Sequence, residues 1–243
     1  MERATQFGLD DYRRLRRLAI AGIALALLLA CVPLHALDDA LIAPFFDGKG
    51  FPLHGARAVE ILHSYAGKIP ALLAALCLIY AAAVPSSRAI GGISRRKAAL
   101  ASLGAMILAL GVVALLKKLT GMDCPWDLSI YGGTAEHSTP LLEMSRGNFS
   151  GHCWPSGYSG GIFCAYGFCL YLCMRGAMRD LRSLAFALVT ALGLLGGVLQ
   201  MARGAHFPTH IVASMGIDFA LCFAVLSPLL RRAAMASGKK SGR

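Results

Sequence analysis

The chain has 243 residues, of which 56% are hydrophobic and only 15% are charged. Because a soluble domain carries about a quarter charged residues, this composition argues against a soluble protein. The net charge of +11 could mark a nucleic-acid-binding protein. We expect no nucleic-acid partner, however, because the basic residues are distributed as in a membrane protein that contacts anionic lipids.

Six apolar blocks predict an all-α, polytopic membrane protein, a bundle of six transmembrane helices. A membrane-spanning helix needs about 20 apolar residues, and the blocks are of that length. They cover residues 15–37, 69–87, 98–116, 157–174, 183–200 and 209–230. We therefore expect a single membrane domain over residues 1–243, with a cytoplasmic tail at 1–14, a six-helix core at 15–230 and a flexible cytoplasmic tail at 231–243.

The distribution of Lys and Arg predicts the topology in a bacterial inner membrane. If both termini are cytoplasmic, most of the 24 basic residues lie on the cytoplasmic side. They are Arg3, Arg13, Arg14, Arg16, Arg17, Arg88, Arg95, Arg96, Lys97, Arg175, Arg179, Arg182, Arg231, Arg232, Lys239, Lys240 and Arg243. Such an excess is typical of cytoplasmic segments, so we expect the two long loops on the outer, periplasmic face.

The two outer loops contain most of the polar residues that could form a site. In residues 38–68, His54 and His63 are either solvated loop residues or part of a site. The second loop begins after Lys117 and Lys118, which either extend to the lipid headgroups or bind a ligand. It is about 40 residues long, too long for an ordinary connector.

Two cysteines fall in the second outer loop, whereas the other six lie in apolar blocks. On an oxidising face Cys124 and Cys153 could form a disulfide, and the alternative is two free thiols near the site. No C-x-x-C motif is present, so the sequence does not indicate a zinc ribbon.

The fourth apolar block begins with Pro155, Ser156 and Gly157. Exposed backbone N–H groups, a hydroxyl and little bulk make such a helix start suitable for binding an anion. The alternative is an ordinary helix start capped by the serine hydroxyl.

The turn between the last two apolar blocks, from Gln200 to His210, also contains Arg203 and His206. Polar residues at a membrane boundary are more often functional than incidental. The two histidines are spaced i, i+4 and could bind zinc with His152, although Pro208 disfavours a regular helix there.

Fixed cations, helix-terminal amides and a histidine are what an enzyme needs to hold and attack a phosphate. The sequence resembles the type 2 phosphatidic acid phosphatase superfamily, which shares a helical fold with vanadium haloperoxidases. Its motifs KxxxxxxRP, PSGH and SRxxxxxHxxxD are matched from Lys117 to Pro125, from Pro155 to Tyr158 and from Gln200 to His210. The resemblance covers residues of about 60 to 225 in this chain.

Four positions depart from the family pattern. Cys124 and Gln200 occupy the slots of two phosphate-binding arginines, and His210 occupies the slot of the aspartate that orients the nucleophile. Arg203 lies one turn beyond Gln200 on the same helix face, so it could supply the missing guanidinium. His210 could accept a hydrogen bond from the nucleophile, although a neutral imidazole supplies no negative charge.

The fourth departure is Tyr158, in the slot of the histidine that protonates the leaving group. A phenol with a reference pKa near 10 is a poorer acid at pH 7 than an imidazolium. Either His152 or His137 supplies the proton instead, or the activity is reduced.

The resemblance implies a metal-independent phosphatase without a cofactor, acting on a membrane lipid phosphate or pyrophosphate through a phosphohistidine. His206 would be the nucleophile, and His210, Tyr158 and His152 the other catalytic candidates. The phosphate-binding candidates are Lys117, Lys118, Ser156, Gly157, Gln200 and Arg203. Alternatives are a phosphotransferase from undecaprenyl pyrophosphate to lipid A and a lipid-binding or transporting relative. Asp218, the lone acid in an apolar block, would hydrogen-bond between helices or orient a site residue.

Overall fold

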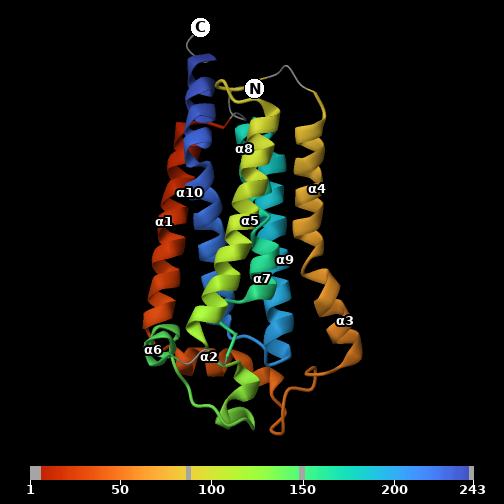
Figure 1. The fold of residues 1–243 in the computed structure, drawn as a ribbon, viewed down its shortest axis with the longest axis vertical. Helices are drawn as coiled ribbons and strands as arrows, with labels where there is room; N and C mark the ends of the chain where they lie inside the picture. Colours follow the sequence, from red (N-terminus) through yellow and green to blue (C-terminus); the bar gives the residue numbers. More distant parts are fainter. Residues whose placement is uncertain (1–6, 86–88, 148–150, 241–243) are drawn as a thin grey trace.

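A bundle of long helices runs along the molecule in the computed structural model, which describes residues 7–85, 89–147 and 151–240 (Figure 1). The predicted cytoplasmic residues Arg3, Arg88 and Arg243 lie outside the described residues, as do the side chains of Lys239 and Lys240. The bundle helices are α1 (Leu9–Cys31), α4 (Ile69–Ala83), α5 (Arg95–Thr120), α7 (Gly157–Phe163), α8 (Tyr166–Met174), α9 (Arg179–Ala202) and α10 (Pro208–Lys240). The described residues contain no β-strand, so the all-α prediction is confirmed.

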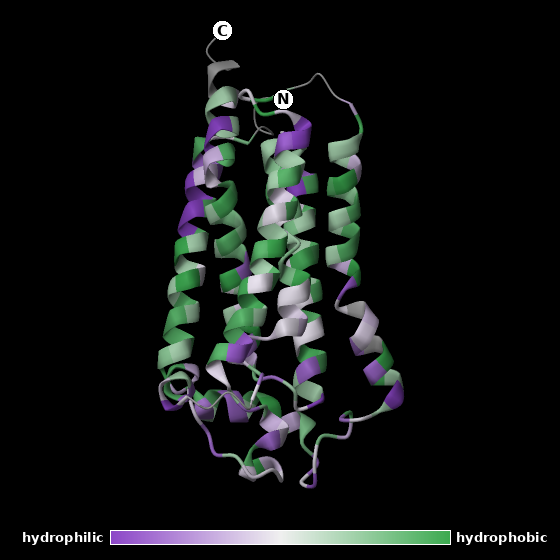
Figure 2. Cartoon of the chain, viewed as in Figure 1, coloured by the Kyte–Doolittle hydropathy of each residue, from purple (hydrophilic) through white to green (hydrophobic). Residues whose placement is uncertain are grey.

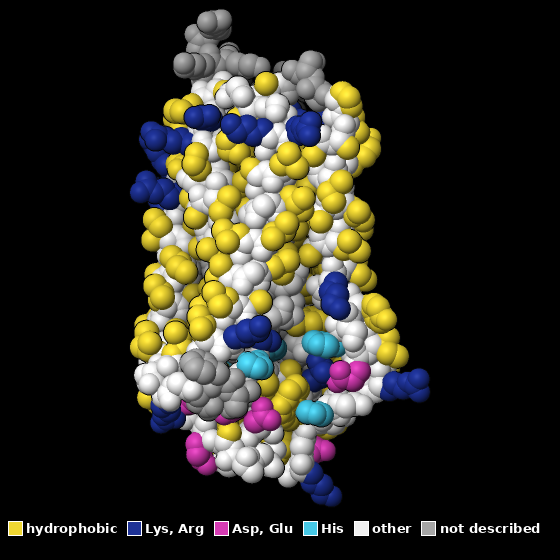
Figure 3. All heavy atoms as spheres, in the orientation of Figure 1, with side chains coloured by type: hydrophobic (Ala, Val, Ile, Leu, Met, Phe, Trp, Pro, Cys, Tyr) yellow, Lys and Arg dark blue, Asp and Glu magenta, His cyan; other side chains and the backbone are white. Residues whose placement is uncertain are grey.

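The bundle has the dimensions and composition of a membrane-spanning domain. Five segments are long and apolar enough to cross a bilayer: 57–83, 95–127, 157–174, 179–202 and 208–237. A sixth qualifies only if α1 is counted together with the segment His35–Phe45, which is bent by 97° from it. Hydrophobic residues cover the middle of the bundle, and hydrophilic residues gather toward its ends (Figures 2 and 3).

Three predicted helix boundaries need correction. The first predicted block, 15–37, ends early because Pro33 follows Cys31, and the chain turns into the short helix α2 (His35–Ile42). The fourth block, 157–174, is divided into α7 and α8. The last helix does not end at 230, because the alanine-rich segment after it favours helix and continues α10 to Lys240.

The two long loops that the sequence predicts on the outer face contain more helix than the sequence suggested. The first includes α2, the 3-10 turn η2 (Ala43–Phe45) and α3 (Arg57–Ala66). The second includes η3 (Pro125–Asp127), η4 (Ser129–Tyr131) and α6 (Pro140–Arg146). Figure 1 shows these elements together at the end of the bundle remote from both termini.

Helix α10 packs against α1, α5, α7 and α8 and so organises the bundle. Its contact with α1 is closest at two glycines, since a Cβ on Gly22 would lie 3.1 Å from the Cα of Gly216. Small residues allow such an approach between membrane helices. This packing fixes the start of α10, and with it the preceding turn, relative to α5 and α7.

Candidate active site

Backbone hydrogen bonds join three segments at the end of the bundle remote from the termini. The N–H of Cys153 donates to the carbonyl of Met122 (2.9 Å), and that of Trp126 donates to the carbonyl of Gly204 (3.0 Å). The structure also links Cys124 and Cys153 by a disulfide, with their Cα atoms 5.1 Å apart. The segment after α5, the segment before α7 and the α9–α10 turn therefore form one rigid unit.

His206 lies in this unit, with only 5% of its surface exposed. It precedes Pro208, the first residue of α10, so its position is set by the helix start. Its Nδ1 lies 2.8 Å from the carbonyl oxygen of Cys153. Because a carbonyl can only accept, Nδ1 carries the proton and Nε2 retains a lone pair.

The expected orienting role of His210 is therefore wrong. The Cys153 carbonyl, rather than His210, accepts the hydrogen bond of the His206 ring. The two histidine rings are T-shaped, with centroids 5.9 Å apart, and Nδ1 of the buried His210 has no partner among the described residues. A backbone acceptor fixes the tautomer of His206 without adding a negative charge.

Burial lowers the pKa of His206 well below its usual 6.5, and the charges of His210 and Lys117 lower it further. A histidine in an apolar, positively charged environment favours its neutral form. Neutral imidazole is the form that can act as a nucleophile. The environment of His206 therefore keeps it competent to attack at neutral pH.

Arg203 is held by two partners, one in α9 and one in α3. Its Nη1 donates to the side-chain oxygen of the fully buried Gln200 (2.8 Å), and its Nη2 donates to the carboxylate of Glu60. Gln200 thus orients the guanidinium in this structure. Glu60, which no sequence motif indicated, occupies Nη2 of Arg203, a group that could otherwise bind an anion.

Lys117 extends from the last turn of α5 to the start of α7. A Cβ on Gly157 would lie 3.1 Å from the Nζ of Lys117, so the glycine makes room for the ammonium group. Ser156 is fully buried and caps α7, its Oγ accepting from the N–H of Ser159. Lys118 is exposed. Of the two lysines, only Lys117 therefore lies against the start of α7.

Tyr158 is packed beside a histidine whose role the sequence left open. The ring of His63, from α3, stacks on it with centroids 4.9 Å apart and an interplanar angle of 16°. The tyrosine ring lies between Gly67 and Gly196, where a Cβ would approach it to 2.6 and 2.7 Å. Nδ1 of His63 is buried and has no partner among the described residues.

His63 and Glu60 lie on the same face of α3. This face is directed toward Tyr158 and Arg203. In the sequence, the amphipathic pattern of residues 57–66 is the feature that indicates this helix. A charge on His63 would lower the pKa of His206, so the two histidines lie within electrostatic range of each other. Two acid–base groups from residues 38–68 thus contact the candidate site residues Arg203 and Tyr158.

The two histidines proposed to replace Tyr158 lie elsewhere. His137 pairs with Asp39, Nε2 to Oδ2 at 3.0 Å, and stacks on His35 with centroids 4.4 Å apart. His152 is exposed, and its Nδ1 makes a long contact of 3.4 Å with the carbonyl of Lys117. His137 is therefore committed to a structural contact, and His152 lies at the edge of the site.

Two further acids lie near the start of α10 or within it. Asp38 of α2 accepts from the N–H and the hydroxyl of Thr209 (3.2 and 2.6 Å), and so caps the start of α10. Asp218 is fully buried in α10, and neither of its oxygens has a hydrogen-bond partner among the described residues. Asp218 thus makes neither of the two contacts expected of it.

Potential metal ligands are not clustered in the described part of the chain, where no three His, Cys, Asp or Glu side chains could share an ion. The groups that converge are instead those that bind an oxyanion. Figure 3 shows basic, acidic and histidine side chains gathered on this end of the bundle, below the hydrophobic band.

Comparison with known proteins identifies the family. The sequence profile of the PAP2 superfamily matches residues 98–233, more than half of the chain and every candidate site residue from Lys117 to His210. No curated protein and no solved structure gives a significant match. The profile supports the resemblance found from the three motifs. The chain belongs to the PAP2 superfamily, whose members are phosphatases that act on phosphate esters.

Proposed function

We propose that this protein removes phosphate from a membrane lipid phosphate or pyrophosphate, with His206 as the nucleophile and without a metal ion. The observation that carries the proposal is the hydrogen bond from Nδ1 of His206 to the Cys153 carbonyl, which leaves Nε2 with a free lone pair. Burial keeps this imidazole neutral, and Lys117 and Arg203 provide positive charge in the same unit.

In the first half-reaction, Nε2 of His206 forms a bond to phosphorus as the bond to the leaving oxygen breaks. Lys117 and Arg203 neutralise the non-bridging oxygens, on which negative charge collects. Water then attacks the phosphohistidine and releases inorganic phosphate. Glu60 must yield its place on Arg203 to the substrate, an exchange of one anion for another.

The leaving oxygen needs a proton, and His63 is the best-placed donor. Its ring stacks on Tyr158, which occupies the slot of the usual acid, and it acts electrostatically on His206. In this scheme His63 gives its proton to the leaving oxygen and, once neutral, accepts one from the attacking water. Tyr158 supplies the surface on which the imidazole stacks.

The position of the site supports a lipid substrate. It lies at the end of the bundle, where the hydrophobic band meets hydrophilic residues (Figure 2). A lipid tail could remain in the bilayer while its phosphate reaches His206. We infer that this end faces the periplasm, with both termini in the cytoplasm, because the described basic residues concentrate at the other end and disulfides persist in oxidising compartments.

Phosphate release by the purified protein in detergent tests the proposal. The panel comprises phosphatidic acid, phosphatidylglycerol phosphate, undecaprenyl pyrophosphate and lipid A, each with the unaltered chain, His206→Ala and His54→Ala. We expect release to be lost only in His206→Ala, because His54 is an exposed residue packed against Trp126. Persistent release by His206→Ala would refute the assignment.

One alternative has a specific observation in its favour. Tyr158 in the slot of the acid would suit a relative that binds or transports a lipid phosphate without turnover. Saturable binding of phosphatidic acid without release, in both the unaltered chain and Tyr158→His, would establish that alternative. Transfer would appear when labelled undecaprenyl pyrophosphate and lipid A are mixed, as labelled lipid A and undecaprenyl phosphate instead of free phosphate.

A further inference from the structure

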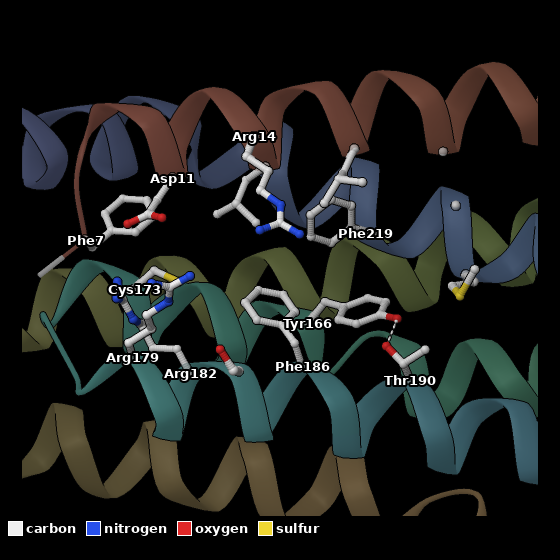
Figure 4. A pocket seen from close by; sticks show the side chains of 16 residues that line it. Phe7, Asp11, Arg14, Tyr166, Cys173, Arg179, Arg182, Phe186, Thr190 and Phe219 are labelled. Carbon is white, nitrogen blue, oxygen red and sulfur yellow. Dashed lines mark hydrogen bonds between the residues drawn. The ribbon is translucent and has the colours of Figure 1, made fainter. Parts of the chain in front are cut away.

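A cavity lies between α1, α8, α9 and α10, away from His206. Figure 4 shows the side chains that line it. Its volume of about 430 Å³ falls in the range of roughly 300 to 1,000 Å³ typical of small-molecule sites. The cavity begins near the starts of α1 and α9 and extends toward the middle of the bundle. None of its lining residues belongs to the phosphate site.

Arginines from facing helices give the outer part of this cavity a positive charge. Arg14 extends into it from α1, and Arg179 and Arg182 extend from α9 (Figure 4). The lining includes one carboxylate, Asp11, which already accepts a hydrogen bond from the N–H of Gly8 (3.1 Å). The cavity is therefore lined by three guanidinium groups and one acid that is partly committed to capping α1. The guanidinium of Arg182 lies over the ring of Phe7, 5.6 Å from its centroid.

The inner part of the cavity is apolar. Leu18, Phe186 and Phe219 contribute hydrocarbon walls. The hydroxyls of Tyr166 and Thr190 hydrogen-bond to each other at 2.8 Å, so they satisfy one another rather than a ligand (Figure 4). Leu18 is 51% exposed at the side of the bundle, where an acyl chain in the bilayer could pass into the cavity.

We propose that this cavity binds an anionic glycerophospholipid, with its phosphate between the arginines of α1 and α9 and one acyl chain along the aromatic wall. Guanidinium groups bind phosphate oxygens through paired, charge-assisted hydrogen bonds. Basic pockets between membrane helices suit anionic headgroups, whereas the cationic part of a zwitterionic headgroup would face like charge. The bound lipid joins α1 to α9 and stabilises the bundle, independently of the phosphatase reaction.

Lipid-dependent stability of the full chain tests this proposal. Thermal unfolding in detergent is followed with added phosphatidylglycerol or phosphatidylcholine, and bound lipid is counted by native mass spectrometry. We expect saturable stabilisation by phosphatidylglycerol alone, because a ligand that binds only the folded state raises its stability. The proposal would be overturned if the two lipids stabilised the protein equally, or if neither lipid stabilised it.

Three variants separate the cavity from general attraction of lipids to basic residues. Arg14→Gln/Arg179→Gln should weaken phosphatidylglycerol binding by at least about tenfold. The matched variant Arg17→Gln, on α1 but outside the cavity, should bind as the unaltered chain does. Leu18→Trp fills the apolar part without changing charge and should also reduce binding. Equal losses in Arg17→Gln and the double variant, or unchanged binding in Leu18→Trp, would contradict a site in the cavity.

Discussion

Replacing His63 by Gln tests the most specific step of the reaction scheme, proton donation to the leaving group. Glutamine keeps a polar side chain of similar reach at this half-buried position of α3, but it cannot deliver a proton. His63 lies against Tyr158 with ring centroids 4.9 Å apart, so the substitution should leave the helix in place. A general acid contributes about 10²- to 10⁴-fold to a rate.

The size of the effect should depend on the leaving group. Phosphatidic acid expels a poorly stabilised alkoxide and needs the proton, so we expect kcat to fall by about 10²-fold or more in His63→Gln. p-Nitrophenyl phosphate expels a stable phenolate, so its kcat should change little. Because His63 is not proposed to bind phosphate, the KM for each substrate should be similar in His63→Gln and in the unaltered chain.

Two comparisons complete this experiment. His54→Gln, an exposed histidine in the same outer loop, should retain full activity on both substrates. Adding Tyr158→His to His63→Gln should restore part of the lost rate, because it returns an imidazole to the neighbouring position. Equal losses on both substrates, or no loss on phosphatidic acid, would refute the role of His63 as the acid.

Three other predictions concern the same end of the bundle. Glu60→Gln should lower KM for phosphatidic acid a few-fold, because its carboxylate competes with phosphate for Arg203; an increased KM would show that Glu60 helps to bind the substrate. Reducing the disulfide between Cys124 and Cys153, which are 29 residues apart, should lower the free energy of unfolding by about 3.6 kcal/mol, and unchanged thermal unfolding in reductant would contradict this. The acid limb of kcat/KM should lie below pH 6.5, because burial lowers the pKa of His206 and the neutral ring persists until the pH falls through that lowered value. An acid limb above pH 6.5 would show that a different group controls the reaction.

The helices were predictable because each is a long apolar block, whereas their interruptions were not. The apolar character continues from α1 into α2 across Pro33, so composition alone gave one block where the chain turns by 97°. The division between α7 and α8 leaves no break in hydropathy either. Local sequence therefore predicted the number of spans better than their ends.

The site was predictable where its members belong to motifs. Lys117, Ser156 and His206 occupy motif positions of the family that the sequence resembles, and Arg203 follows one helical turn after the slot of a motif arginine. The acceptor for His206 could not be found in this way, because it is the backbone carbonyl of Cys153 and any residue type would supply it.

The sequence left the role of His63 open for another reason. It lies far from Tyr158 in the sequence, and its role depends on how α3 folds over the start of α7. The amphipathic pattern of α3 indicated a buried face, but not what that face would cover.

Detection of phosphate on His206 would test the central claim most directly. The purified protein is mixed with labelled phosphatidic acid and quenched in alkali, which preserves phosphohistidine, and its peptides are then mapped by mass spectrometry. We predict a phosphorylated peptide that contains His206 in the unaltered chain and none in His206→Ala. Turnover without label on His206, or label on another residue, would contradict the account.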